Sequence, residues 1–290
     1  MPRTIGLIAA YSKPEASHLL EEVRPYLEAA GCHVVEEDDL PTFDLATLDA
    51  IVVLGGDGLM MRAANSFPDV PLLGINFGKV GFLAMVEQRD WRPSLDAMLS
   101  GDYRVDNGST LGAVVERDGA STDLGWAIND VVVRGGVRMV EIEVYIDGQY
   151  VNTYPGDGMI VATPRGSTAY GMAAGGPILT AGVRGFAIVP ISCHSPIRTP
   201  FVVAESSTMQ LLVASKHDAS LILDGRPTGE LRERDVVKVT RGSHEFRMVT
   251  LASMNFYEAF RSKFNFRIRP DAVPTLNDPP VVIARESSAV

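Results

Sequence analysis

Two Gly-Asp-Gly turns, each joined to an apolar run, constrain the fold of this chain more than any other feature. The run Ile51 to Leu54 leads into Gly55-Gly56-Asp57-Gly58, and Gly156-Asp157-Gly158 leads into the run Met159 to Ala162. An aspartate between glycines at a strand end stands in a tight turn, where no neighbouring side chain shields it. The glycine amides let a phosphate approach the backbone closely. The pair of turns therefore indicates phosphoryl transfer.

The charge of the chain limits its partners. The 290 residues are 46% hydrophobic and 21% charged, which is typical of a globular protein with room for two domains. The net charge of −10, with no run rich in Lys or Arg, disfavours nucleic acid and anionic lipid. An acidic protein that handles nucleotide phosphates usually needs a divalent cation to offset the mutual repulsion, so we expect Mg²⁺ or a similar ion as cofactor.

The cysteines and the hydropathy pattern bear on the compartment. Cys32 and Cys193 are far apart and are the only cysteines, so neither a disulfide framework nor a zinc pattern is expected. No apolar run approaches the ~20 residues of a membrane span, and no signal-peptide pattern follows Met1. We expect a cytoplasmic protein without a membrane partner.

Strand and helix signals alternate over residues 1–102. A Ser12–Glu15 capping box starts the first expected helix, Gly31 stops it, and Pro25 would kink it. The other expected helices are 59–66 and 91–99, and the expected strands are 4–10, 33–35, 51–54 and 72–75. This alternation predicts an open α/β layer of the Rossmann-like class as the N-terminal domain.

Short alternating strands dominate residues 103–250. Asp-Gly pairs at 118–119, 147–148 and 224–225 are typical of hairpin turns, so we predict a β-rich sandwich as the second domain. Residues 251–269 are predicted to form a helix that returns to the first domain, with Phe256, Phe260 and Phe264 on one stripe. Residues 270–290 are expected to be an extended or disordered tail.

The turn at Asp57 has two interpretations. The preceding strand brings it to the carboxyl edge of a parallel sheet, where α/β proteins bind ligands, and the following helix would point its first amides at a phosphate. Asp57 can then accept a proton from an attacking hydroxyl or help to hold a metal; alternatively, it only caps the helix. The turn is not a dehydrogenase fingerprint, because Met61 stands where the pattern from Gly56 needs its third glycine.

Two further segments combine an apolar strand with groups that can bind a nucleotide. After the strand 72–75, a glycine-spaced loop offers Lys79 to phosphate and Phe82 to a base, or is a plain connection with Phe82 in the core. Asn129 and Asp130 stand in the middle of an apolar strand. Both a bulge that aims them into a cleft and a buried hydrogen-bonded pair are compatible with that position.

The segment 156–177 carries the longest signal. A strand ends at Thr163-Pro164, and a Gly-Ser-Thr turn follows. A helix of small residues is expected to run through Ala169, Ala173 and Ala174 to Gly175-Gly176-Pro177. Hydroxyls and free amides at the helix start can bind ribose, an adenine edge or phosphate, and Tyr170 can stack on a base. The alternative, a capped helix packed through its alanines, accounts for fewer of these groups.

Taken in this order, the segments resemble the NAD kinase family. The matching segments are GGDG at 55–58, GINFGKVGFL at 74–83, AINDVVV at 127–133, GDGMIVATPRGSTAY at 156–170, AGGPIL at 174–179 and LDG at 223–225. Similar proteins phosphorylate the adenosine-ribose 2′-hydroxyl of NAD to give NADP, using ATP or polyphosphate with a divalent cation. The resemblance implies an α/β domain, a β-rich domain, a dinucleotide site in the cleft between them, and a homodimer or homotetramer.

The resemblance also implies roles for single residues. Asp57 would be the catalytic aspartate that activates the 2′-hydroxyl. Gly55, Gly56 and Gly58 would line the phosphate path, and Phe82 would border the adenosine pocket. Asn129 and Asp130 would bind the substrate nucleoside. The rest of the dinucleotide site would be formed by Asp157, Thr168, Ala169 and Tyr170. The last group would act across a subunit interface.

Three positions depart from the family pattern. Leu59 stands where a threonine hydroxyl would order phosphate, and Asp130 replaces a glutamate that is one methylene longer. Arg165 replaces a small hydroxyl residue; it would clamp a phosphate, including that of NADP, or alter the choice of substrate. Because Asp57 is intact, we expect an active kinase whose donor and substrate preferences stay open.

Two alternatives remain from the sequence. A lipid kinase that acts on diacylglycerol or sphingoid bases shares a GGDG turn, but it would lack the GSTAY segment and present an apolar acyl channel. A non-catalytic NAD or NADP sensor would keep the pocket and lose turnover through Leu59 and Arg165.

Overall fold

The N-terminal part of the chain alternates strands and helices, as expected. The computed structural model describes residues 3–77, 81–180, 182–194, 196, 198–257 and 259–260. Its first elements are β1 (Thr4–Ala9), α1 (Pro14–Ala29), β2 (His33–Glu36), η1 (Leu40–Thr42), η2 (Leu45–Thr47), β3 (Ala50–Leu54), α2 (Asp57–Ser66), β4 (Leu72–Asn76), β5 (Val86–Glu87), η3 (Gln88–Asp90) and α3 (Trp91–Ser100).

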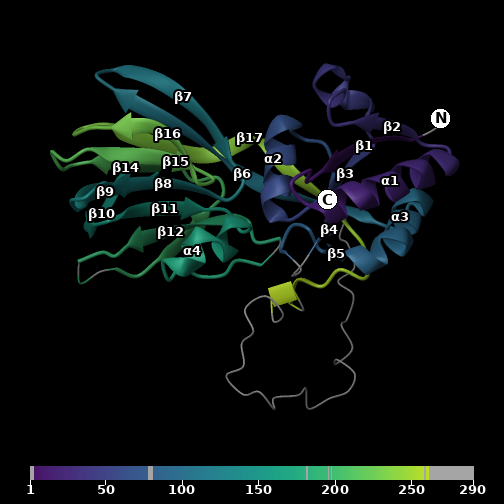
Figure 1. Cartoon of the computed structure of the whole chain (residues 1–290). Helices are drawn as coiled ribbons and strands as arrows, with labels where there is room; N and C mark the ends of the chain where they lie inside the picture. The colour runs from purple at the N-terminus through teal and green to yellow at the C-terminus, as the bar shows by residue number, and fades with distance from the viewer. Residues whose placement is uncertain are drawn as a thin grey trace, which may run out of the picture.

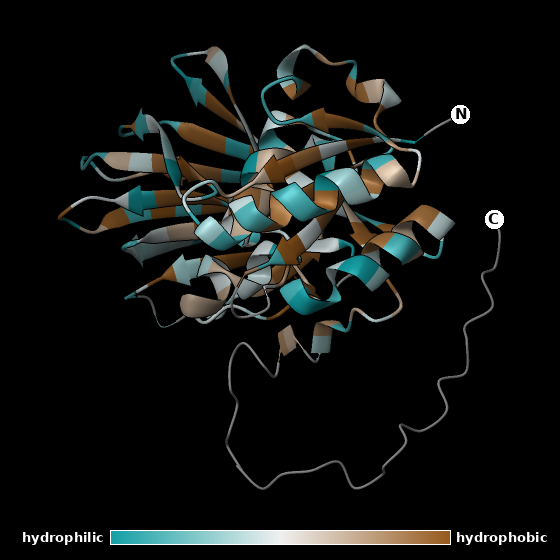
Figure 2. Ribbon diagram, turned by 45° about the vertical axis from the view of Figure 1, so that its right-hand side comes forward, coloured by the Kyte–Doolittle hydropathy of each residue, from teal (hydrophilic) through white to brown (hydrophobic). Residues whose placement is uncertain are grey.

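These elements form an open α/β layer. Strands β2, β1, β3 and β4 pair in parallel in that order. Helices α1 and α3 pack their apolar stripes on one face of the sheet, and α2 packs on the other. Figure 2 shows hydrophobic strands inside and hydrophilic stretches along the outer sides of the helices. Because the strands are covered on both faces, they read as continuous apolar runs in the sequence.

Two helix starts differ from the expectation. Helix α1 has Lys13 as its N-cap, with no side-chain cap bond, so the expected capping box is wrong; Pro14, whose nitrogen needs no acceptor at that position, provides the start instead. Pro25 remains inside α1, which continues to Ala29. Helix α2 begins at Asp57, two residues earlier than expected, and this places the aspartate in its first turn.

The strands between residues 104 and 250 form a β-sandwich. Its strands are β6 (Arg104–Arg117), β7 (Ala120–Ala127), β8 (Asp130–Gly135), β9 (Val140–Ile146), β10 (Gln149–Gly156), β11 (Gly158–Ala162), β12 (Gly185–Ile191), β13 (Phe201–Ala204), β14 (Met209–Val213), β15 (Ala219–Leu223), β16 (Arg226–Leu231) and β17 (Val236–Thr250). One sheet has the order β13-β12-β11-β8-β15-β16, and its inner face packs on strands of the other sheet. In Figure 1 the sandwich lies on the left and the α/β layer on the right.

Local turn chemistry sets the hairpins of the sandwich. The aspartates at 118, 147 and 224 have φ of 51°, 51° and 49°, and the glycine that follows each of them also has a positive φ. This backbone matches the tight two-residue turn that Asp-Gly pairs favour, so the three predicted turns are confirmed.

A single sheet joins the two parts of the molecule. Strand β17 pairs with β6 along most of its length and meets β4 in parallel at Met248 and Leu72. The order β10-β9-β14-β17-β4-β3-β1-β2 therefore runs from the sandwich into the α/β layer. The division of the chain near residue 102 stays a prediction.

The end of the described chain reaches the α/β layer. Phe256 and Phe260 belong to one helical turn, in which residue 258 is not described, and their rings lie 5.6 and 6.4 Å from that of Phe82. A helix over 251–269 is not evident, and residues 261–290, which include Phe264 and the expected tail, lie outside the described residues. Among the described residues, no helix is long and apolar enough to cross a membrane.

Candidate active site

The carboxylate of Asp57 is held by the loop that follows β4. Its oxygens accept hydrogen bonds from the backbone N–H groups of Phe82, Leu83 and Ala84 at 3.0, 3.1 and 3.0 Å. Amides aimed at a carboxylate in this way stabilise its ionised form. The N-cap of α2 is Gly56, with no side-chain cap bond, so the interpretation of Asp57 as a mere helix cap does not describe what its side chain does.

Glycines allow this loop to pass close to β4 and to the start of α2. A β-carbon on Gly74 would lie 2.7 Å from Cα of Ala84, and Gly81 backs directly onto the Asp57 carboxylate. Lys79, predicted to reach phosphate, lies outside the described residues. The glycine spacing that suggested a ligand loop thus serves first to bring the backbone amides to Asp57.

The other glycines of the GGDG turn differ in access. Gly55 is buried, and a β-carbon on it would lie 2.5 Å from Cδ2 of Leu59. Gly56 is half-buried beside Asn76, whereas Gly58 is exposed and a β-carbon there would meet nothing within 4 Å. Leu59, the departure from the family pattern, therefore packs on the turn, and Gly58 leaves the first amides of α2 open to a ligand.

Asn129 and Asp130 do not lie within one strand. Strand β7 ends at Ala127 and β8 begins at Asp130, so the expectation of a polar pair in mid-strand is wrong. The chain bends there because Asp224 accepts the N–H groups of Ile128, Asn129 and Asp130 at 2.8, 2.7 and 3.2 Å.

Asp224 is therefore a residue of the site that the sequence reasoning left out. Its side chain orders a bend 94 to 96 positions earlier in the chain. The LDG segment at 223–225 belongs to the family pattern, but nothing in its neighbouring residues indicates that this aspartate orders a bend so far away in the sequence.

The charges of two carboxylates interact at this bend. Asp130 is only 5% exposed; burial, together with the charge of Asp224, raises its pKa from 3.8 to about 7. Burial also raises the pKa of Asp224, against the lowering effect of its three amide bonds. Asn129 points toward α2, since its Nδ2 lies 3.2 Å from Sδ of Met61. The bend thus faces the helix that begins with Asp57.

The Gly-Ser-Thr turn packs on the same bend. A β-carbon on Gly166 would lie 1.9 Å from the backbone oxygen of Asn129. Thr163 Oγ1 donates to the carbonyl of Ile128 at 2.7 Å and accepts the N–H of Gly166 at 3.0 Å. The hydroxyl of Thr168 donates to the carbonyl of Arg165, so this group first stabilises its own turn.

The expected helix of small residues is much shorter than predicted. A 3₁₀ turn, η4 (Gly166–Thr168), precedes a single helical turn, α4 (Tyr170–Ala173), so the prediction of a helix to Ala174 and beyond is wrong. Gly175 at φ 88° turns the chain away. Tyr170, which follows Ala169 at the start of α4, packs half-buried on the outer face of the six-stranded sheet.

A pocket of about 550 Å³ lies between the loop that holds Asp57 and the Gly-Ser-Thr turn. Its wall contains three of the predicted site residues, Phe82, Arg165 and Thr168. Phe82 is 8% exposed and packs on Phe256, as a core residue does, and it also lines this pocket. Its contact with a base stays a prediction. The loop that holds Asp57 therefore forms one wall of this pocket.

Asp157 lies apart from this group within the chain. It stands between β10 and β11, at the opposite end of β11 from the Gly-Ser-Thr turn, where its backbone pairs with Gly135 and Ile191. The structure of one chain thus brings together Asp57, Phe82, Asn129 and the 163–170 turn, but not Asp157.

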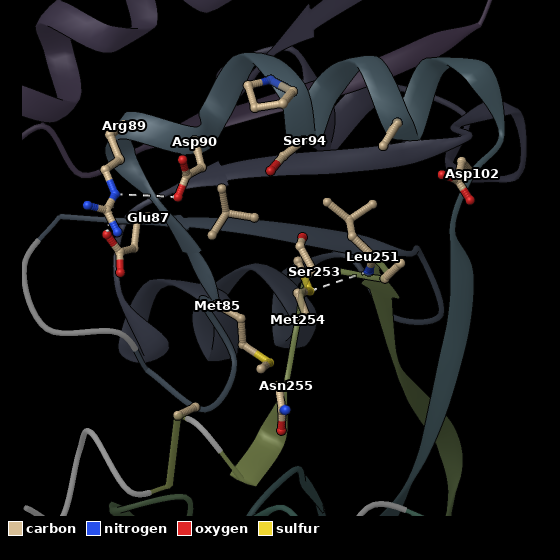
Figure 3. Close-up of a pocket in the computed structure, with 15 residues that line it drawn as sticks. Met85, Glu87, Arg89, Asp90, Ser94, Asp102, Leu251, Ser253, Met254 and Asn255 are labelled. Carbon is tan, nitrogen blue, oxygen red and sulfur yellow. Dashed lines mark hydrogen bonds and ion pairs between the residues drawn. The ribbon is translucent and has the colours of Figure 1, made fainter. Parts of the chain in front are cut away.

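A second pocket of about 640 Å³ lies under α3 (Figure 3). Figure 3 shows Asp90 and Ser94 above it and Met254 and Asn255 below it, while Arg89 pairs with Asp90 at its edge. None of the predicted site residues lines it. In the described part of the chain, no group of three or more His, Cys, Asp or Glu side chains is placed to hold a metal ion.

Comparisons with known proteins agree with the motifs. Residues 9–103 match the family model of the ATP-NAD kinase N-terminal domain, and residues 128–251 match that of the C-terminal domain. A NAD kinase of Thermomicrobium roseum is 54% identical over 275 residues, which cover 95% of this chain and 96% of that protein. A NAD kinase of Moorella thermoacetica is 34% identical, with 89% and 88% covered.

Solved structures show the same fold. A yeast NADH kinase complexed with NADH superposes with a TM-score of 0.82 at 19% identity, over 95% of this chain and 90% of that one. A NAD kinase from Archaeoglobus fulgidus in complex with ATP gives 0.70 at 22% identity, over 91% and 97%. With both domain matches in order and relatives that span nearly the whole chain, this chain belongs to the NAD kinase family.

Proposed function

We propose that this protein transfers the terminal phosphate of ATP to the adenosine-ribose 2′-hydroxyl of NAD, which gives NADP and ADP. The observation that carries the proposal is the placement of Asp57, whose carboxylate lies in the first turn of α2 and is fixed by three N–H groups of a loop that also lines a pocket. The 54% identical NAD kinase spans 96% of its own length in the comparison, which supports the same activity here.

Asp57 acts as the general base in this proposal. Its carboxylate takes the proton of the 2′-hydroxyl as that oxygen attacks the terminal phosphorus. The new O–P bond forms while the bridging O–P bond to ADP breaks. The loop amides orient the carboxylate before the proton arrives.

The start of α2 is suited to the transferred phosphate. The first amides of the helix and its positive dipole end lie beside the exposed Gly58. The Asp57 oxygens already accept three N–H bonds, which is compatible with a Mg²⁺ ion held mostly by phosphate oxygens and water. Mg²⁺ would offset the negative charge of the phosphates. Polyphosphate is the alternative phosphate donor in this proposal.

The dinucleotide would be bound by the bend at Asn129 and Asp130, which Asp224 holds in place. Thr168, Ala169 and Tyr170 would contribute from the turn that packs on this bend. Asp157 lies at the other end of β11 and cannot join the group within one chain. We infer that it serves the site of a neighbouring copy, in a homodimer or homotetramer.

The test is direct. Purified protein is incubated with NAD, Mg²⁺ and either ATP or polyphosphate, and NADP is measured. The proposal expects NADP with at least one donor. Tight binding of NAD or NADP with no NADP formed from either donor would instead identify the non-catalytic sensor, in which Leu59 or Arg165 has abolished turnover.

A further inference from the structure

The pocket beside Asp57 is rich in arginine. Of its lining residues, four are the arginines Arg104, Arg165, Arg184 and Arg241, and three are the carboxylates Asp106, Glu205 and Glu245. The pocket therefore has a formal charge of +1, in a chain whose net charge is −10. A positive cavity in an acidic protein attracts anions that the rest of the surface repels. We call this cavity the arginine pocket.

The three carboxylates are engaged by only two of the arginines. Arg104 pairs with Asp106 at 3.1 Å. Arg241 pairs with Glu245 at 3.0 Å and lies 3.8 Å from Glu205. Within the described chain, Arg165 and Arg184 have no carboxylate within 4.0 Å of their nitrogens. Arg165 and Arg184 therefore carry two unpaired positive charges, while Arg241 with its two carboxylates carries one negative charge, which gives the net charge of +1.

Arg165 is built into the pocket wall. Its guanidinium lies 5.0 Å from the ring centroid of Phe246, and Nη1 lies 3.8 Å from Sδ of Met248. Gly108 leaves room for it, since a β-carbon there would lie 2.8 Å from Nε of Arg165. That Nε is buried and has no hydrogen-bond partner.

A buried Nε–H without an acceptor is costly, and the Phe246 ring and the Met248 sulfur are weak partners for a cation, so an anion that reaches the guanidinium from the pocket would stabilise it. Burial lowers the pKa of Arg165 from 12.5 to about 10, with the charge of Asp106 opposing the shift. The guanidinium is therefore still cationic at neutral pH. Its rigid fork of N–H donors suits phosphate oxygens better than any neutral acceptor.

We propose that Arg165 and Arg184 bind the phosphate chain of a substrate in the arginine pocket. This inference rests on the proposed function and deepens it, because it makes Arg165 a specificity-determining residue at a position where the family pattern has a small hydroxyl residue. This phosphate chain is the triphosphate of ATP or the diphosphate of NAD. Both present adjacent phosphate groups, and Phe82 and Leu83 place the pocket next to Asp57.

The first test uses inorganic tripolyphosphate and needs no turnover. Its binding to the intact protein is measured by titration calorimetry for wild type, Arg165→Gln, Arg184→Gln and the control Arg89→Gln. The control removes the same charge in the other pocket. Loss of a charge-assisted contact predicts about tenfold or weaker binding for the first two variants and less than about twofold for the control. Equal affinities in all four proteins would overturn the proposal.

A second variant protects the test against misfolding. Gly108→Ala keeps every charge but pushes a methyl group against Nε of Arg165. Thermal unfolding shows whether each variant folds. If Arg165→Gln fails to fold, Gly108→Ala decides: about tenfold weaker binding supports the proposal, and wild-type affinity overturns it.

Steady-state kinetics then identify which substrate supplies the phosphate chain that the pocket binds. In Arg165→Gln or Gly108→Ala, a higher KM for ATP alone assigns the pocket to the donor, and a higher KM for NAD alone assigns it to the dinucleotide. Unchanged values for both overturn the inference. If NADP forms but Arg165→Gln binds tripolyphosphate as tightly as the wild type does, the inference fails and the proposed function stands. If tripolyphosphate binds through Arg165 but no NADP forms, only the proposed function fails.

Discussion

A β-carbon on Gly81 would lie 1.8 Å from Oδ1 of Asp57. No real β-carbon comes this close to another atom, so the glycine and the aspartate fit together as a pair. The neighbouring amides of Phe82, Leu83 and Ala84 reach the carboxylate because nothing projects from Gly81. The position of the proposed general base therefore depends on a glycine 24 positions away.

Gly81→Ala should displace the Asp57 carboxylate. A shift of about 1 Å at a reacting group can cost about a hundredfold in rate, so we expect kcat to fall by about that factor. The matched control is Gly136→Ala, where an added β-carbon meets nothing within 4 Å. NADP formation is measured for both. Equal turnover in the two variants would show that the loop does not position Asp57.

Asp224→Ala should destabilise the protein and weaken NAD binding. Three N–H groups of the bend at 128–130 lose their acceptor, so we expect the free energy of unfolding to fall by about 3 kcal/mol. The KM for NAD should rise because Asn129 and Asp130 are no longer held. Asp224→Asn keeps one acceptor oxygen and should lose less.

Asp118→Ala is the control for this change. Asp118 has nearly the same backbone, with φ of 51° against 49°, and is also followed by glycine, but its side chain is 84% exposed and pairs only with Arg232 among the described residues. Urea unfolding of both variants separates the loss of the turn residue from the loss of the three hydrogen bonds. Equal losses would show that the side chain of Asp224 does not stabilise the bend.

Asp130 should make the stability depend on pH. Its pKa is about 7 in the folded protein and 3.8 in its usual environment. Between these values the folded state holds a proton that the unfolded state has released. The free energy of unfolding therefore decreases as the pH rises from about 4 to about 7, by at most about 4 kcal/mol from this group.

Asp130→Asn removes that contribution. Urea unfolding of wild type and variant at pH 5 and pH 8 should show that the wild type loses more stability over this interval. Other carboxylates titrate in both proteins, so the comparison isolates Asp130. The same loss in both proteins would mean that Asp130 is ionised throughout.

The sequence was sufficient for features that depend on neighbouring residues. Apolar runs such as 51–54 predicted the parallel strands, and the Asp-Gly pairs predicted the hairpin turns. The change from alternating strand and helix signals to short strands predicted an α/β layer and a β-sandwich, both of which the structure has. Periodicity and turn chemistry are local, and here tertiary packing agrees with them.

Long-range contacts decided the features that the sequence did not predict. The break between β7 and β8 follows from Asp224, and the room for Arg165 follows from Gly108, which is 57 positions away. Neither composition nor spacing reveals which distant residue will supply an acceptor or leave a gap.

The most direct test of the account is the rate of NADP formation by Asp57→Asn, measured together with its affinity for NAD. Asparagine cannot take the proton, so we expect kcat to fall by about a thousandfold. Since this residue acts mainly in the transition state, NAD affinity should stay within about threefold. Turnover close to that of the wild type would contradict the proposal that Asp57 is the general base.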